Sequence, residues 1–506
     1  MNRAETPLDR WSLTGSRAFV SGRMSKGAVW VALGVGTALI GAISSYRPMY
    51  AVGAVVAIFV VIKPWFGLMG ALALESTKLI PVMTGVPSST VTMMAGALIY
   101  ISLYSVLIQG RSRFLPLFQI IGALIIIFGT GIVSEIVTTN LLHVSSTLNL
   151  LLAPVAAALV SRGMGKGAHR LLLRFVVLIL LVNALACIWE IHAGTPELVA
   201  SGLKYGSVIR EIGGVLRSPG LMLTNADAGV FAGAGMLWLL VGWRIKSIRF
   251  SLIWLVVGLS AGAVVLVLST SRSGVILFVV GAVVNVLAIW RGHVKHSRHG
   301  KFVSLIVVAL VLVLPVLFLQ NGATSADSLF KRFSAWSGLI KGQISFFGLG
   351  GGTVGGSSFS QWNSGSSIFV DNSWVSILLQ YGLLGLVSVL VILRISVRRL
   401  FLSLQRGTST ESRLQVAGIL AVVIGMAVTG FVTEILDYFL AMVMLGAAIG
   451  MCMTDAADFG SDGGELKPAV PTSSDIIDAF RTRRSERLAG VQSVAQPSRH
   501  DSGITE

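Results

Sequence analysis

A carboxylate and an amide, Asp371 and Asn372, stand where a long polar stretch gives way to an apolar run. The run has the length and composition of a membrane-spanning helix, so we expect the pair at its N-terminus, beside the water boundary. A carboxylate at that place fits two structural roles: a helix cap, because free N–H groups and the positive end of the helix dipole favour an anion, or a salt bridge that only orders an arginine. The functional alternative is a base that accepts a proton from a substrate hydroxyl within hydrogen-bond reach.

Arginines stand beside other apolar runs. Arg217 begins the segment 217–220, which reads Arg-Ser-Pro-Gly and leads to Asn225 at an expected helix start, and Arg272 ends the turn 269–272, which reads Ser-Thr-Ser-Arg. A planar guanidinium binds phosphate oxygens in pairs, so both residues suit a diphosphate clamp. The structural alternatives are an ordinary loop-to-helix junction at Arg217 and contact with lipid headgroups at Arg272.

A third arginine, Arg332, precedes Trp336 by four residues, so the two side chains share one face of a helix. We expect an amphipathic helix on the outer surface, where the ring contacts sugar and the guanidinium contacts phosphate. The Gly-rich segment 348–352 follows in the same long polar stretch. Arg210, seven residues before Arg217, is a further candidate for phosphate binding.

The composition indicates what positions these residues. The chain has 506 residues, 54% hydrophobic and 12% charged, with a mean hydropathy of +0.82, a balance that soluble globular proteins do not have. Repeated apolar runs predict an all-α polytopic membrane protein with about 12 to 14 transmembrane helices within residues 27–453, the lower number applying if 49–80 is one re-entrant pair. The expected spans are 27–45, 49–63, 65–80, 89–108, 115–134, 147–161, 171–191, 224–243, 250–270, 274–290, 302–320, 372–393, 414–432 and 434–453.

Basic residues set the expected orientation, because Lys and Arg collect in cytoplasmic loops. With the segment 1–26 in the cytoplasm, 30 of the 39 Lys and Arg residues fall on that side. The long loops 192–223 and 321–371 then lie outside. The tail 454–506, rich in charge, Ser and Pro, is expected to be cytoplasmic and disordered. This topology accounts for the net charge of +17, so nucleic acid is not an expected partner.

No cofactor and no metal is expected. Cys187 and Cys452 both fall in apolar runs, which indicates neither a disulfide framework nor a metal site. The expected outer loops carry no His and Cys cluster and no acidic pair of the Asp-x-Asp kind.

Four segments resemble, in their order along the chain, the bacterial O-antigen ligase and Wzy-type O-antigen and exopolysaccharide polymerase family. They are the Arg-x-x-Gly segment at Arg217, the Ser-x-Ser-Arg turn at Arg272, the Arg and Trp pair with a later Gly-x-Gly, and Asp371-Asn372, which nine residues separate from Gly382 and two more from Gly385. The resemblance spans Arg210 to Gly385. The N-terminal half is similar only in hydropathy.

The resemblance implies a GT-C-like fold and a metal-independent glycosyltransferase. Its substrates would be undecaprenyl-diphosphate-linked saccharides at the outer face of the cytoplasmic (inner) membrane. Further partners implied are membrane lipid, a flippase and chain-length regulator proteins. The resemblance assigns catalysis to Asp371, Arg217, Arg272 and Arg332, and substrate binding to Arg210, Asn225, Trp336 and Asn372.

One position separates the two branches of the family. The ligases carry His where this chain has Asp371, whereas Asp-Asn there resembles the polymerases, so a polymerase is expected and a ligase is the alternative. From another class, a polysaccharide flippase or transporter would place ionisable residues along a central pathway. Glu75 and Lys78 are almost the only candidates for that, as an i,i+3 pair near a helix end. A structural membrane protein without this chemistry is a third possibility.

The topology predicts the outcome of reporter fusions at Gly355 and Gly463. We expect the first to report an extracytoplasmic position and the second a cytoplasmic one, because of the asymmetry of Lys and Arg. A cytoplasmic signal at Gly355 would put every candidate residue of the long outer loop on the wrong side of the membrane.

Overall fold

The computed structural model describes residues 59–108, 141–203, 210–212, 214–291, 370–407 and 409–453, with isolated positions between 334 and 354. All of them belong to one unit of the chain, Met1–Thr454. The expected spans 27–45, 115–134 and 302–320, the segment 1–26 and the tail 454–506 lie outside the described residues.

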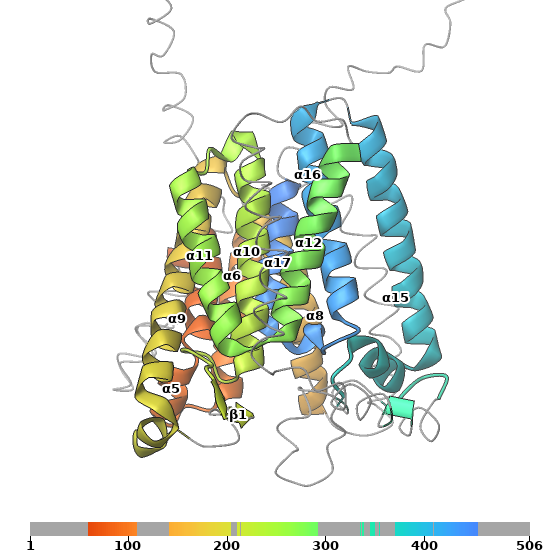
Figure 1. Cartoon of the computed structure of the whole chain (residues 1–506). Helices are drawn as coiled ribbons and strands as arrows, with labels where there is room; N and C mark the ends of the chain where they lie inside the picture. The colour runs from red at the N-terminus through yellow and green to blue at the C-terminus, as the bar shows by residue number, and fades with distance from the viewer. Residues whose placement is uncertain are drawn as a thin grey trace, which may run out of the picture. The chain divides into compact units, whose positions relative to one another are not determined.

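The described part is a bundle of helices (Figure 1). Seven helices within it are long and apolar enough to cross a membrane, which agrees with an all-α polytopic membrane protein. They are α6 (Ser88–Ile108), α9 (Lys166–Ala200), α10 (Asn225–Arg244), α11 (Leu252–Ser269), α12 (Arg272–Arg291), α15 (Ser373–Arg406) and α16 (Thr410–Thr429).

The described part also contains the helices α4 (Trp65–Ser76), α5 (Leu79–Met83), α8 (Leu141–Arg162) and α17 (Phe439–Cys452). The 12 residues of α4 extend over about 18 Å, less than the roughly 30 Å of a hydrocarbon core. The expected span 65–80 is therefore divided: α4 ends at Ser76 and the chain turns into α5. The total of 12 to 14 crossings stays a prediction.

The helix α10 is the centre of the bundle. It packs against α9, α11, α12, α16 and α17, and nearly all of its residues are buried. Small residues allow this, because a Cβ added at Gly233 would overlap the carbonyl group of Gly274 on α12. Close backbone approach through small residues is how helices associate in a bilayer, where lipid removes the hydrophobic gain of packing.

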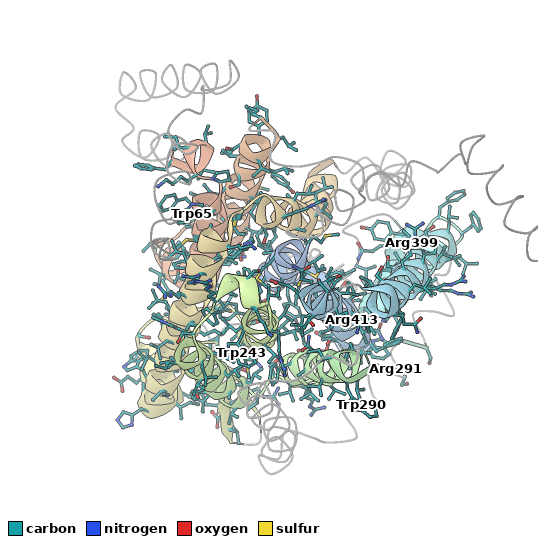
Figure 2. The ribbon with its side chains drawn as sticks, turned by 90° about the horizontal axis from the view of Figure 1, so that it is seen from above. Trp65, Trp243, Trp290, Arg291, Arg399 and Arg413 are labelled. Carbon is teal, nitrogen blue, oxygen red and sulfur yellow. The ribbon has the colours of Figure 1, made fainter. Side chains whose placement is uncertain are left out.

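Loops expected in the cytoplasm meet at one end of the bundle. The amide of Ser247 donates to the carboxylate of Glu411 at 3.0 Å, and Arg170 Nε donates to the carbonyl of Ile248 at 2.9 Å. Figure 2 shows this end from above, with Arg291, Arg399 and Arg413 over α12, α15 and α16. Which side of the membrane this end faces stays a prediction.

The expected outer loop 192–223 contains regular secondary structure. The helix α9 continues to Ala200 through a kink at Gly194, and the strands β1 (Arg210–Ile212) and β2 (Val215–Arg217) form an antiparallel hairpin. The hairpin is a short addition to a described part that is mostly helical, which agrees with the all-α expectation. Gly214, with φ 75°, supplies the positive φ that such a tight turn needs, and Leu216 anchors the hairpin on the buried side chains of Leu79, Leu198 and Leu203.

Candidate functional site

Two of the four family-like segments lie side by side. The amide of Ser218, next to Arg217, donates to the carbonyl of Leu268 at 3.1 Å. Asn225 Nδ2 donates to the carbonyl of Ser269, also at 3.1 Å. The segment that begins at Arg217 is thus hydrogen-bonded to the last turn of α11, directly before the turn that carries Arg272.

The helix α10 begins at Asn225, as expected, with Asp227 also beside its N-cap. Thr224 is the N-cap, and its hydroxyl oxygen accepts from the amide of Asp227 at 3.1 Å. Asn225 is buried, with 6% of its surface exposed, and its amide holds the α11–α12 turn. The structure therefore gives Asn225 a positioning role, and its contact with substrate stays a prediction.

Buried polar side chains of α9 hold the segment 217–224 from the other side. The carboxylate of Glu190, 2% exposed, accepts from the amide of Gly220 at 2.9 Å and from the hydroxyl of Ser218. Asn183 Oδ1 accepts from the amide of Leu221 at 3.2 Å. The sequence analysis did not single out Glu190, although a lone acid inside an apolar run is a signal of a polar partner nearby.

The hairpin brings two arginine positions together. Its register sets Arg210 directly opposite Arg217 across the two strands. The two positions are therefore neighbours in the hairpin, and phosphate binding by either arginine stays a prediction.

The turn between α11 and α12 is strained. Thr270 has a φ of 49°, in the left-handed region that a β-branched residue avoids, at a cost of about 1 to 3 kcal/mol. Its side chain is buried, and the hydroxyl has no hydrogen-bond partner in the structure. The neighbouring hydroxyls of Ser271 and Ser273 are 3.1 Å apart and are paired with each other. Arg272, which begins α12, is half-buried.

The expected pair Glu75 and Lys78 forms an ion pair at 3.3 Å, and Lys78 Nζ also donates to the hydroxyl of Thr92. The next residue, Leu79, donates its amide to the carbonyl of Leu221 at 3.0 Å. The ion pair therefore lies at the C-terminal end of α4, beside the segment that begins at Arg217.

Asn372, not Asp371, caps α15. Asn372 Oδ1 accepts from the amides of Trp374 at 2.9 Å and Val375 at 3.1 Å. Its Nδ2 donates to the carbonyl of Phe431 at 3.2 Å. Asp371 is half-buried and stands directly before this cap. The N-cap of α15 is therefore Asn372 and not Asp371. A substrate contact of Asn372 stays a prediction.

A buried acid that the sequence analysis missed lies next to this cap. Glu434 is 6% exposed and accepts from the hydroxyl of Ser376, to which Gln380 Nε2 donates at 2.6 Å. The turn after α16, which carries Glu434, is hydrogen-bonded to the start of α15, since the amide of Ser373 donates to the carbonyl of Gly430 at 2.8 Å. Glu434 is the first residue of the last expected span, 434–453, and an acid at the edge of an apolar run is the signal that could have identified it.

The loop 345–349, which leads into the Gly-rich segment, is inserted into a kink of α15. Gly382 has φ 67° and ψ −169°, so the helix loses its regular bonds there. The loop 345–349 replaces them: the amide of Leu349 donates to the carbonyl of Leu379 at 2.7 Å, and the amide of Leu383 donates to the carbonyl of Ser345 at 3.2 Å. The third and fourth family-like segments are therefore joined through backbone hydrogen bonds.

Trp336 differs from the expected surface aromatic. It is 7% exposed and packs with the buried side chains of Val354, Val370 and Leu379. A large ring releases more free energy when buried against apolar neighbours than when exposed, so this tryptophan anchors the loop near Asp371. Arg332 lies outside the described residues.

The two pairs of segments lie at the same end of the bundle. The helices α12 and α16 pack with Gly425, near the C-terminus of α16, against Leu277, near the N-terminus of α12. The C-terminus of α16 leads into the turn that contacts Asn372. Figure 1 shows the β1 hairpin and the beginning of α15 at this same end, opposite the end seen in Figure 2.

No protein-family model matches the chain, and no curated protein matches it either. Among the described residues, no three His, Cys, Asp or Glu side chains group as metal ligands would.

The insertion at Gly382 predicts a coupled pair of mutants. Gly382→Ala should lower the free energy of unfolding by about 1 to 3 kcal/mol, because the conformation is nearly restricted to glycine and a Cβ would overlap the carbonyl of Phe346. Gly348→Ala should act similarly, because its Cβ would overlap the carbonyl of Gln380. Thermal unfolding in detergent measures both.

The double mutant should lose much less than the sum of the two, because both substitutions break one contact. Gly167→Ala on α9 is the control, since a Cβ there meets nothing within 4 Å. Additive losses for Gly348→Ala and Gly382→Ala would show that the loop and the kink do not depend on each other.

Proposed function

We propose that the protein polymerises undecaprenyl-diphosphate-linked oligosaccharide units into O-antigen or exopolysaccharide at the outer face of the cytoplasmic membrane. The observation that carries the proposal is the pair of hydrogen bonds that join the Arg217 segment to the Arg272 turn, from Ser218 to Leu268 and from Asn225 to Ser269. Two segments that resemble the family's phosphate-binding motifs, some 50 residues apart in sequence, are neighbours in space.

The proposed reaction transfers a glycosyl group. An acceptor sugar hydroxyl attacks the anomeric carbon of a lipid-linked saccharide, a new glycosidic bond forms, and the bond from that carbon to the diphosphate breaks. The hydroxyl proton passes to a base, and undecaprenyl diphosphate leaves with its negative charge. Arg217, Arg272 and Arg332 stabilise that charge, with Arg210 beside Arg217.

Asp371 is the proposed base. Because Asn372 supplies the cap of α15, the Asp371 carboxylate is not needed for that purpose. It is half-buried at the end of the bundle that carries Arg217 and Arg272, and partial loss of water favours proton acceptance while nearby cations oppose it. The buried carboxylate of Glu434 accepts from the hydroxyl of Ser376 and so holds the first turn of α15, next to the cap, in position.

Replacement of an arginine by lysine tests the clamp. Arg217→Lys and Arg272→Lys should each lower polymer formation on the order of tenfold or more, because lysine keeps the charge and loses the planar fork. The measurement is polymer length and amount on gels, in cells whose own copy is deleted. Arg399→Lys, at the other end of the bundle, is the control and should have no effect. Full activity of both lysine variants would contradict bidentate phosphate binding.

Asp371→Asn tests the base, because the amide keeps the size and cannot take the proton. We expect loss of polymer with accumulation of single lipid-linked units in a stably expressed protein. Glu411→Gln, which changes an acid that binds the Ser247 amide at the other end of the bundle, should leave the polymer unchanged. A normal polymer from the Asp371→Asn variant would exclude the base role. Transfer of glycan to lipid A core or protein by the wild type would assign the chain to the ligases instead.

A further inference from the structure

Thr270 combines two features that are unfavourable in the protein alone. Its backbone has a φ of 49°, although a β-branched side chain crowds its own backbone in that conformation. Its hydroxyl is buried, since the residue is 6% exposed, and has no hydrogen-bond partner in the protein. Glycine would remove both costs at this position, so the fold by itself gives no reason for threonine.

The surroundings of Thr270 favour an anion. It lies two residues before Arg272, at the start of a helix of 20 residues whose first turn presents N–H groups and the positive end of the dipole. The Ser218 amide and Asn225 bind the two carbonyls just before Thr270, those of Leu268 and Ser269. The hydroxyls of Ser271 and Ser273, on either side of Arg272, are hydrogen-bonded to each other. Of the three hydroxyls in this turn, that of Thr270 is therefore the one that can donate to a ligand.

We propose that the Thr270 hydroxyl donates a hydrogen bond to an oxygen of a phosphate group that Arg272 also binds. The proposal rests on the proposed function for the source of that phosphate, the diphosphate of a lipid-linked saccharide. The strained backbone is retained because it aims the hydroxyl at the ligand, as strained residues do at binding sites. Thr270 is thus a positioning and binding residue beside the arginine.

The test uses the full chain in detergent and measures binding of undecaprenyl diphosphate by the rise of the unfolding temperature. Thr270→Val keeps the shape and removes the hydroxyl, so it should bind about tenfold more weakly, as expected for loss of a hydrogen bond to a charged group. Thr270→Ser keeps the hydroxyl and should bind within about threefold of the wild type.

A third variant separates strain from ligand binding. Thr270→Gly should unfold, without ligand, at a temperature no lower than the wild type, because the left-handed conformation suits glycine, and should show the same weak binding as Thr270→Val. Ser412→Ala is the matched control: Ser412 also has a buried hydroxyl without a partner, on α16 at the other end of the bundle. It should bind undecaprenyl diphosphate as the wild type does.

Binding by Thr270→Val within twofold of the wild type would overturn the inference, and so would a wild type that does not bind undecaprenyl diphosphate. Equal stabilisation by phosphatidylglycerol, lost in Thr270→Val, would support the phosphate site and would contradict the proposed function by making the ligand a lipid headgroup. Normal Thr270-dependent binding in a protein that forms no polymer would likewise separate the two: the site would stand and the polymerase proposal would fail.

Discussion

Hydrogen bonding of the backbone wherever a helix ends or bends is the constraint on which this structure depends. In lipid an unbonded amide or carbonyl costs several kcal/mol, so irregular backbone persists only where protein groups bind it. In the described part of the chain, several such places lie at the end of the bundle that carries Arg217 and Asp371. The carbonyls of Leu268 and Ser269 bind the segment that follows β2, and the kink at Gly382 binds the loop 345–349.

This constraint explains why polar residues far apart in sequence come together. Each break in a helix needs donors and acceptors from another segment, and these segments carry the arginines and the acid. Asn372 is an example, because its side-chain amide both caps the N-terminus of α15 and donates to the carbonyl of Phe431. Asp371 stands directly before this cap, so its position depends on the same contacts.

The apolar runs predicted most of the described helices, because membrane crossing requires long uncharged segments whatever the tertiary contacts are. The predicted spans 224–243 and 250–270 correspond closely to α10 and α11. The hairpin at Arg210 and Arg217 was not predicted, since three-residue strands leave no periodic pattern and depend on packing against Leu79 and Leu198.

The four segments of the candidate site could be selected from their motifs and their order in the sequence. The hydrogen bonds between them could not, because each bond depends on the position of a second segment in the fold. Trp336 was expected on the surface because its spacing from Arg332 indicated an amphipathic helix, and only the positions of Val354, Val370 and Leu379 show that it is buried. Glu190 and Glu434 were missed for the same reason: their partners, Ser218 and Ser376, are 28 and 58 residues away in the chain.

The most direct measurement is reconstitution of the purified protein in liposomes with a short undecaprenyl-diphosphate-linked oligosaccharide and no other protein. A polymerase predicts a ladder of lipid-linked products that differ by one repeat unit, with one undecaprenyl diphosphate released for each bond formed. Movement of the lipid-linked saccharide across the bilayer with no new glycosidic bond would contradict the account and would assign the bundle to transport.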